Sequence, residues 1–260
     1  MSKQTPKSTF TLTFSECVEN HAGMQMIGDS SNKQGFSVET LQKLAKKYNG
    51  KLYDLNSLLD DDPPELSVMP DDASLLVFKN GLENIFGISQ SDLFDEHKVL
   101  DVDKKAFMYG RTVNKKARHN LCFADFSQEP EYENKKGRVI NFKDDSIKLT
   151  NLLRQKLGEF GDEFKDLYAE GNYYYDVEKC YISAHGDKER LCVVGVRLGE
   201  IFPLHYQWYY KGNKVGENFT IDLEGGDIYI MSAKAVGNDW KSRNKYTLRH
   251  SAGLKKNMKD

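Results

Sequence analysis

Residues 179–198 read Lys179-Cys-Tyr-Ile-Ser-Ala-His185 and, after the polar interval Gly-Asp-Lys-Glu-Arg190, Leu191-Cys-Val-Val-Gly-Val-Arg-Leu198. Both runs are short, rich in β-branched and aromatic residues and lack a helical period, which is typical of strands. Four further runs of this kind follow, separated by turn residues: 204–210, 215–223, 227–232 and 245–251. Six short strands with no helix between them predict an antiparallel sandwich, jelly roll or barrel.

A histidine and a carboxylate two residues apart, His185 and Asp187, stand where the first of these strands ends. On extended backbone the two side chains project to the same side. They supply two of the three ligands of a 2-His-1-carboxylate site for Fe(II), which leaves coordination positions open. Farther along, Arg243 and Arg249 lie six residues apart, and a guanidinium fork binds a carboxylate bidentately. The pattern predicts a metal centre that works with a dicarboxylate co-substrate.

This combination resembles the Fe(II)/2-oxoglutarate dioxygenases, and most closely their AlkB-like branch. The stretch Tyr181–Gly199 looks like the family's His-x-Asp strand and the strand after it, and Gly226-Asp227-Ile-Tyr-Ile-Met-Ser232 looks like the segment before its distal histidine. Arg243 and Arg249 match the spacing of its terminal arginines. The resemblance covers roughly residues 105–255. It implies an α+β, mainly β fold: a double-stranded β-helix (jelly-roll) core braced by helices, with an N-terminal extension.

The resemblance also assigns roles. His185 and Asp187 would be iron ligands, Arg249 would hold the distal carboxylate of 2-oxoglutarate, and Arg243 would lie near the co-substrate or the substrate. Asn172 and Tyr174 fall where the family keeps an Asn and a Tyr that contact 2-oxoglutarate. The implied enzyme is a dioxygenase that uses Fe(II), 2-oxoglutarate and O₂ to hydroxylate a C–H bond, and to release formaldehyde where that bond belongs to an N-methyl group.

The third metal ligand is the open point of this resemblance. The family's second histidine belongs between Ser232 and Arg243, where this chain has none. Lys234 or Asp239 could occupy that place, although a protonated lysine cannot bind a cation. The other histidines that could approach are His205 and His250. His250 directly follows Arg249, so on a regular strand the two would face opposite sides, and both could serve the site only through a bulge or a strand end.

The first hundred residues match no motif. Phe10-Thr-Leu-Thr-Phe14 alternates like a strand, Ser37 can cap a helix that ends at Asn49-Gly50, and Ser74–Phe78 is another expected strand. The run Asp60-Asp-Asp-Pro-Pro64 can continue neither a helix nor a strand. We therefore expect an accessory region over residues 1–100 and a dioxygenase domain over residues 101–260. One or two amphipathic helices are expected between Ser146 and Glu170.

The composition of the chain limits the binding partners and the cellular compartment that we expect for the protein. Lys+Arg 37 against Asp+Glu 39 gives a formal net charge of -2, so no global positive field attracts nucleic acid or anionic membrane. No apolar run reaches the roughly 18 residues of a membrane span. The four cysteines lack CxxC spacing, which favours reduced thiols in a cytoplasmic or nuclear protein.

A local exception to this balance is the stretch 103–120, where basic and aromatic residues alternate. It is either a solvated surface or a positive lip that holds phosphates while an aromatic ring stacks on a base. Within the dioxygenase hypothesis, alkylated nucleic acid or a nucleobase is therefore the first substrate class, and a protein side chain or a small metabolite is the second. The rival hypothesis is a catalytically inactive jelly-roll binding module, which the missing histidine favours.

Overall fold

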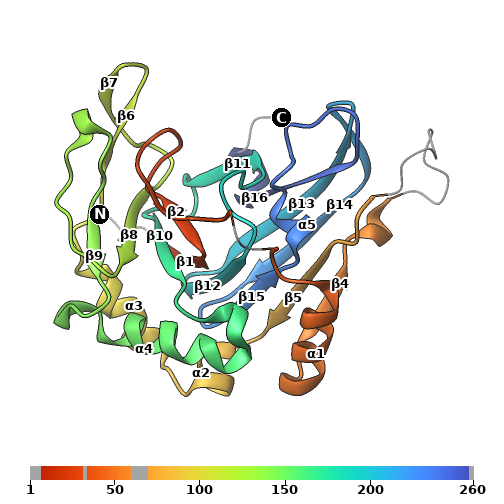
Figure 1. The fold of residues 1–260 in the computed structure, drawn as a ribbon, viewed down its shortest axis with the longest axis horizontal. Helices are drawn as coiled ribbons and strands as arrows, with labels where there is room; N and C mark the ends of the chain where they lie inside the picture. Colours follow the sequence, from red (N-terminus) through yellow and green to blue (C-terminus); the bar gives the residue numbers. More distant parts are fainter. Residues whose placement is uncertain (1–6, 32–33, 60–69, 258–260) are drawn as a thin grey trace, which may run out of the picture.

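Two β-sheets lie face to face in the computed structural model of the chain, which describes residues 7–31, 34–59 and 70–257 (Figure 1). The larger sheet holds, from edge to edge, β4 (Lys51–Asp54), β5 (Ser74–Phe78), β15 (Ile228–Met231), β12 (Val193–Gly199), β1 (Thr9–Ser15), β10 (Tyr168–Tyr174), β8 (His119–Ala124) and β9 (Val139–Asn141). The smaller sheet holds β11 (Tyr181–His185), β16 (Thr247–Gly253), β13 (Phe202–Tyr210) and β14 (Asn213–Leu223). The chain is therefore mainly β, as the sequence predicts.

Two hairpins and a set of helices complete the fold. The hairpins are β2 (Cys17–Glu19) with β3 (Met26–Gly28), and β6 (Lys105–Met108) with β7 (Arg111–Asn114). The helices are α1 (Val38–Tyr48), α2 (Gly81–Phe86), α3 (Gln90–Lys98), α4 (Lys148–Leu157) and α5 (Ala233–Val236). Short 3₁₀ turns cover Asn56–Leu58, Tyr132–Asn134, Asp145–Ile147, Gly158–Phe160, Asp162–Phe164 and Lys255–Asn257. No helix in the described ranges is long and apolar enough to cross a membrane.

The six C-terminal strands expected from the sequence are β11 to β16, with ends shifted by at most two residues. The expected helix after Ser37 is α1, whose first turn is capped by the Ser37 hydroxyl accepting from the Thr40 N–H. The helix expected up to Glu170 is wrong in its second half. After α4 the chain makes two 3₁₀ turns around Gly161, whose φ of 152° favours glycine, and then enters β10.

The N-terminal strand does not belong to a separate unit. β1 lies in the middle of the larger sheet, where it pairs with β10 on one side and β12 on the other. The expected boundary near residue 100 is therefore wrong, because the sheet of residues 101–260 is incomplete without residues 9–15. The alternation of Phe10-Thr-Leu-Thr-Phe14 predicts the strand, but a strand pattern does not name its partners. The Asp60–Pro64 break lies outside the described residues.

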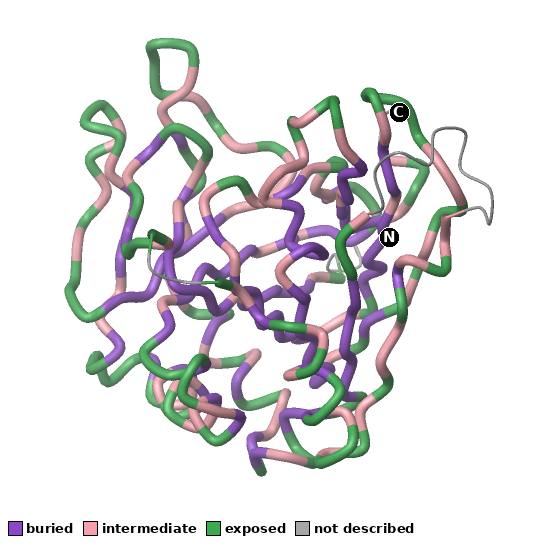
Figure 2. The backbone as a smooth tube through the Cα atoms, turned by 45° about the vertical axis from the view of Figure 1, so that its right-hand side comes forward, coloured by how far each residue is buried: buried purple, intermediate pink, exposed green. Residues whose placement is uncertain are grey.

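The two faces of the larger sheet have different characters. Phe10, Leu12 and Phe14 of β1 point to the outer face, which buries the main apolar core against the helices, including Leu153 of α4 and Leu41 of α1. The threonines between them point to the inner face, toward the smaller sheet. Figure 2 shows that buried residues concentrate in the interior of the molecule, whereas exposed residues lie around its rim. The inner face therefore offers polar groups to the space between the sheets.

Candidate metal centre and its cavity

Two histidines and one aspartate converge on the inner wall of the smaller sheet. His185 is the last residue of β11, Asp187 follows in the loop, and His250 lies within β16, directly opposite His185 in the β11–β16 pairing. One potential ligand atom from each side chain lies within 4.8 Å of the other two. The structure thus brings together all three residues that the sequence nominated as metal ligands.

The atoms of this triad have the orientation that coordination requires. Nδ1 of His185 lies 2.7 Å from the Ser183 carbonyl oxygen, to which it donates, so the lone pair remains on Nε2. That Nε2 is 3.4 Å from Oδ1 of Asp187, and Nε2 of His250 is 3.8 Å from the same oxygen. Neighbouring ligands about 2.1 Å from one metal lie roughly 3 Å apart. A small contraction of the triad is therefore enough to close it around a first-row metal.

The loop between the two sheets holds Asp187 in place. The Asp187 N–H donates to the Val236 carbonyl oxygen at 3.0 Å, which fastens the loop to α5. Gly186 lies so close to the C-terminal end of α5 that an added Cβ would be 2.0 Å from the Gly237 carbonyl oxygen. Only glycine fits at this position, because the close contact is with backbone that a side chain cannot push aside.

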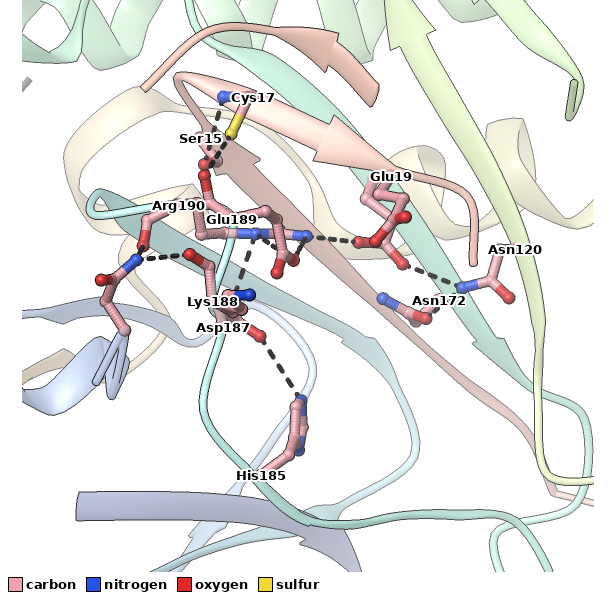
Figure 3. A network of polar contacts seen from close by, with 12 residues as sticks. Ser15, Cys17, Glu19, Asn120, Asn172, His185, Asp187, Lys188, Glu189 and Arg190 are labelled. Carbon is pink, nitrogen blue, oxygen red and sulfur yellow. Dashed lines mark hydrogen bonds and ion pairs between the residues drawn. The ribbon is translucent and has the colours of Figure 1, made fainter. Parts of the chain in front are cut away.

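A buried arginine balances the negative charge behind the triad. Arg190 contacts Glu170 at 3.0 Å, Glu189 at 2.9 Å and Asp187 at 3.8 Å, and its side chain is 4% exposed. In Figure 3, Asp187 lies between His185 and Arg190. Burial alone would raise the pKa of Asp187, but the charge of the Arg190 guanidinium outweighs it and holds that pKa well below its usual range. Asp187 is therefore a carboxylate at neutral pH.

His250 is held neutral by its surroundings. Burial lowers the pKa of His250 to about 4. Its side chain is 8% exposed, and its ring lies 4.5 Å from that of His185, centroid to centroid. A neutral imidazole is the form that binds metal, so neither pH nor burial prevents His250 from acting as a ligand.

A cavity of about 760 Å³ opens in front of the triad, between the two sheets. Its wall on the larger sheet is a set of polar side chains on neighbouring strands. Arg197 of β12 is the cross-strand partner of Thr11 of β1, which is the partner of Asn172 of β10. Asn172 and Tyr174, which the resemblance places near 2-oxoglutarate, both line this cavity. Asn172 Oδ1 accepts from Arg118 Nε at 2.6 Å.

The two arginines assigned to the co-substrate lie elsewhere. Arg249 and His250 are consecutive on a regular part of β16, so His250 faces the cavity and Arg249 faces the other side. There the guanidinium stacks on the Tyr209 ring at 3.8 Å. Arg243 is exposed in the loop before β16. Because a strand presents only one of two adjacent side chains to a given face, Arg249 does not face the cavity in which it is expected to hold the distal carboxylate. Arg243, expected near the co-substrate or the substrate, is not among the residues that line the cavity.

Lys234, Asp239 and His205 are each engaged away from the triad. The Lys234 ammonium binds Asp239 at 2.9 Å and the Tyr246 carbonyl oxygen at 2.8 Å. The two ring nitrogens of His205 contact Thr220 Oγ1 and the Gly253 carbonyl oxygen. Within the described part of the chain, His250 alone joins His185 and Asp187 in such a cluster, which makes it the third ligand of the candidate site.

The comparisons with known proteins place the chain without naming an activity. No protein-family model matches it. A protein of Acanthamoeba polyphaga mimivirus with the name "Uncharacterized protein R156" is 47% identical over 259 residues, which is 97% of this chain and 98% of the viral protein. The chain belongs to the same family as that viral protein. The match spans nearly the whole of both chains, so it includes the N-terminal strand as well as the C-terminal one.

The sequence interpretation missed three residues of the cavity. Arg197 lies in an otherwise apolar strand, Val193-Val-Gly-Val-Arg-Leu198, where a buried charge needs a partner. Thr11 belongs to the polar face of an alternating strand in a region expected to be accessory. Arg190 follows the His-x-Asp motif closely, but its charge was not connected with Asp187. Each of these three residues stands out in the sequence, but only the fold shows that all three line one cavity.

The basic and aromatic stretch 103–120 is divided between two environments. Lys115 turns inward, where its ammonium contacts Asn20 at 2.8 Å and Asn120 at 3.0 Å, and burial lowers its pKa to about 8. Arg118 lines the cavity. The β6–β7 hairpin instead projects from the molecule, with Tyr109 at its tip 89% exposed (Figure 1). Because Asn20 also lines the cavity, this hairpin is anchored beside its mouth.

Proposed function

We propose that this protein is an Fe(II)- and 2-oxoglutarate-dependent dioxygenase. The observation that carries the proposal is the convergence of His185, Asp187 and His250 on the wall of the cavity between the two sheets. Two imidazoles and one carboxylate are the donor set of the open Fe(II) sites that use a co-substrate and O₂. The donor set fits the metal, since both Nε2 atoms are directed at the carboxylate and Asp187 is ionised.

The arrangement of strands supports a double-stranded β-helix as the scaffold. From β10 onward the chain passes between the larger and the smaller sheet: β10, β12 and β15 join the larger, and β11, β13, β14 and β16 join the smaller. A jelly roll needs an eighth strand, in the larger sheet. β1 takes that place between β12 and β10, so in our proposal the first strand of the chain closes the core.

In this proposal His185, Asp187 and His250 would hold the iron at the wall of the cavity. Bound iron would couple the oxidative decarboxylation of 2-oxoglutarate to hydroxylation: one atom of O₂ enters succinate as CO₂ leaves, and the other enters a substrate C–H bond. The chain's own contribution is to orient the ligands through Ser183 and Arg190, and to bind the co-substrate along the Asn172 and Tyr174 wall.

Alkylated nucleic acid remains the first substrate class to test. The support is the β6–β7 hairpin beside the cavity mouth, which exposes Tyr109 among Lys104, Lys105 and Arg111. An aromatic ring among cations suits an unstacked base and its phosphates. The rival proposal of an inactive binding module loses its main support, because His250 supplies the imidazole that the segment between Ser232 and Arg243 lacks.

The test combines metal binding with turnover. Purified protein loaded anaerobically with Fe(II) should release CO₂ and succinate from 2-oxoglutarate on admission of O₂, and N-methylated oligonucleotides should raise that rate and yield formaldehyde. His185→Ala should abolish both, whereas His205→Ala, whose imidazole lies outside the triad, should not. A parent protein that binds no divalent metal, or that binds iron and never turns over 2-oxoglutarate with any substrate class, would refute the proposal.

A further inference from the structure

Arg197 is a buried cation for which the described part of the chain supplies no counter-charge. Its residue is 1% exposed, it lies on β12, and it lines the cavity. One terminal nitrogen donates to the Thr11 hydroxyl, while Nε has no hydrogen-bond partner within the described residues. The guanidinium carbon lies 5.1 Å from the centre of the Phe202 ring. A polar group buried in this way destabilises the fold unless a partner arrives.

The carboxylate of Asp227, whose backbone carbonyl accepts from the Arg197 N–H at 2.9 Å, is already engaged. Asp227 binds the Lys79 ammonium at 2.6 Å and accepts from the backbone N–H groups of Asn80 at 2.9 Å and Glu224 at 2.8 Å. Among the cavity's other acids, Glu170 and Glu189 are paired with Arg190. The protein therefore neutralises the second buried arginine of this cavity, Arg190, and leaves Arg197 with an uncompensated charge.

The groups around Arg197 are suited to an anion. Thr11 and Asn172 follow it across the sheet, and Tyr174 and Tyr229 line the same cavity. Tyr229 lies flat over Gly195, where an added Cβ would be 1.9 Å from the ring, so its place is fixed. Burial raises the pKa of Tyr229 to about 12, so its hydroxyl keeps its proton at neutral pH. One guanidinium fork among neutral hydroxyl and amide groups matches a carboxylate, which the fork binds through two parallel hydrogen bonds.

We propose that Arg197 anchors a carboxylate ligand and, resting on the proposed function, that it binds the far carboxylate of 2-oxoglutarate in place of Arg249. Arg197 belongs to the larger sheet and the metal triad to the smaller, so a dicarboxylate would span the cavity between them. β1, which pairs with β12, offers threonines to the cavity and no cation. The carboxylate anchor therefore lies on β12.

The experiment measures binding with Mn(II) in place of iron and without turnover. Calorimetry should show that 2-oxoglutarate binds the Mn(II)-loaded parent, and that Arg197→Met weakens this binding at least about 100-fold, as expected for loss of a buried charge partner. Arg249→Met is the matched control, on β16 but facing away from the cavity, and should bind as the parent does. Pyruvate, which lacks the far carboxylate, should bind the parent and Arg197→Met equally.

A second measurement separates a ligand anchor from a structural arginine. Without ligand, Arg197→Met should melt at the same temperature as the parent or higher, because an unpaired buried charge is replaced by an apolar chain of similar length. A large fall in melting temperature would make Arg197 structural and overturn the inference.

The inference is also overturned if Arg197→Met binds 2-oxoglutarate unchanged, if Arg118→Gln loses the binding instead, or if inorganic phosphate competes better than glutarate. These three outcomes leave the metal centre intact. A parent protein that fails to bind Mn(II) at all refutes the proposed function. If such a parent still binds glutarate through Arg197, the carboxylate anchor stands by itself, and if it does not, both fail.

Discussion

His185 and His250 face each other as cross-strand partners of β11 and β16, with their ring centroids 4.5 Å apart. The backbone ladder between two antiparallel strands fixes such a pair more firmly than a loop could. Asp187 is the one member of the triad carried by a loop, and that loop is fastened to α5. If the triad binds a metal as proposed, two ligands on strands and one on a clamped loop would form a site that requires little rearrangement on binding.

The cross-strand pair makes His250 as necessary for metal binding as His185. We expect His250→Ala to weaken the binding of Mn(II) or Fe(II) more than 100-fold, since the loss of an outer-shell partner alone typically costs about 10–100-fold. Isothermal titration with Mn(II) measures this directly. His205→Ala is the control, because that imidazole also lies in the smaller sheet but contacts Thr220 and Gly253. Equal affinities for parent and His250→Ala would place the third ligand elsewhere.

A buried histidine far from the cavity predicts how stability depends on pH. His97 of α3 is 1% exposed, its Nε2 lies 2.7 Å from the Thr150 hydroxyl oxygen, and burial lowers its pKa to about 3. Thr150 donates its own proton to Glu96, so it accepts from His97. Below a pH of about 6.5 the unfolded chain takes up a proton at this position and the folded chain does not. The contribution of His97 to stability therefore falls as the pH drops from about 6.5 toward 3.

At pH 5 this loss amounts to about 2 kcal/mol relative to pH 7.5. Urea unfolding of the parent and of His97→Gln at the two pH values isolates it, because glutamine can still donate to Thr150 but does not titrate. Other groups change stability in both proteins alike, so the difference between the two pH dependences is the quantity to measure. If the two proteins lose the same free energy between pH 7.5 and pH 5, His97 is not held neutral in the fold.

The strands could be predicted from the sequence because they depend on local pattern. The alternation at Phe10–Phe14 and the short runs between 179 and 251 each identify a strand to within two residues. What local pattern cannot supply is pairing: nothing near Thr11 indicates that its neighbour across the sheet is Arg197, 186 residues away. The expected domain boundary near residue 100 fails for the same reason, since it follows the extent of the recognisable motifs and not the pairing of β1 with β10 and β12.

The candidate site, too, could be predicted only where its residues lie close together in the sequence. His185 and Asp187 lie two residues apart, so their convergence follows from strand geometry alone. The choice between Arg249 and His250 depended on the register of β16, which a sequence leaves open. In the register that the structure shows, His250 faces the cavity and Arg249 stacks on the Tyr209 ring. Arg197 shows the same apolar-strand signal as Arg249, and only the fold distinguishes an arginine that faces a cavity from one that stacks on a ring.

The tight contact at Gly186 makes a further prediction. An added Cβ would lie 2.0 Å from the Gly237 carbonyl oxygen, so Gly186→Ala must displace either α5 or the Asp187 loop. We expect a loss of about 1–3 kcal/mol in the free energy of unfolding and a fall in metal affinity. Gly158→Ala is the control: its Cβ would meet only the flexible Lys165 side chain, at 3.1 Å. Urea unfolding and Mn(II) titration of both variants test this, and a Gly186→Ala protein with parental metal affinity would show that the loop does not position Asp187.

Arg190 combines stability and metal binding in one side chain, and the two effects can be separated. Arg190→Met leaves Glu170 buried without its counter-charge, so the free energy of unfolding should fall by about 3–5 kcal/mol. The same change removes the nearest cation from Asp187 and should lower Mn(II) affinity by about 10–100-fold, the usual effect of losing an outer-shell partner.

Adding Glu170→Gln to Arg190→Met removes the uncompensated charge and should restore most of the stability. It should not restore metal affinity, because Asp187 still lacks its arginine. Urea unfolding and calorimetry of the parent, both single variants and the double variant form a cycle that measures the two effects independently. If metal affinity recovers together with stability, Arg190 acts on the metal centre only by keeping the protein folded, and Asp187 does not depend on its charge.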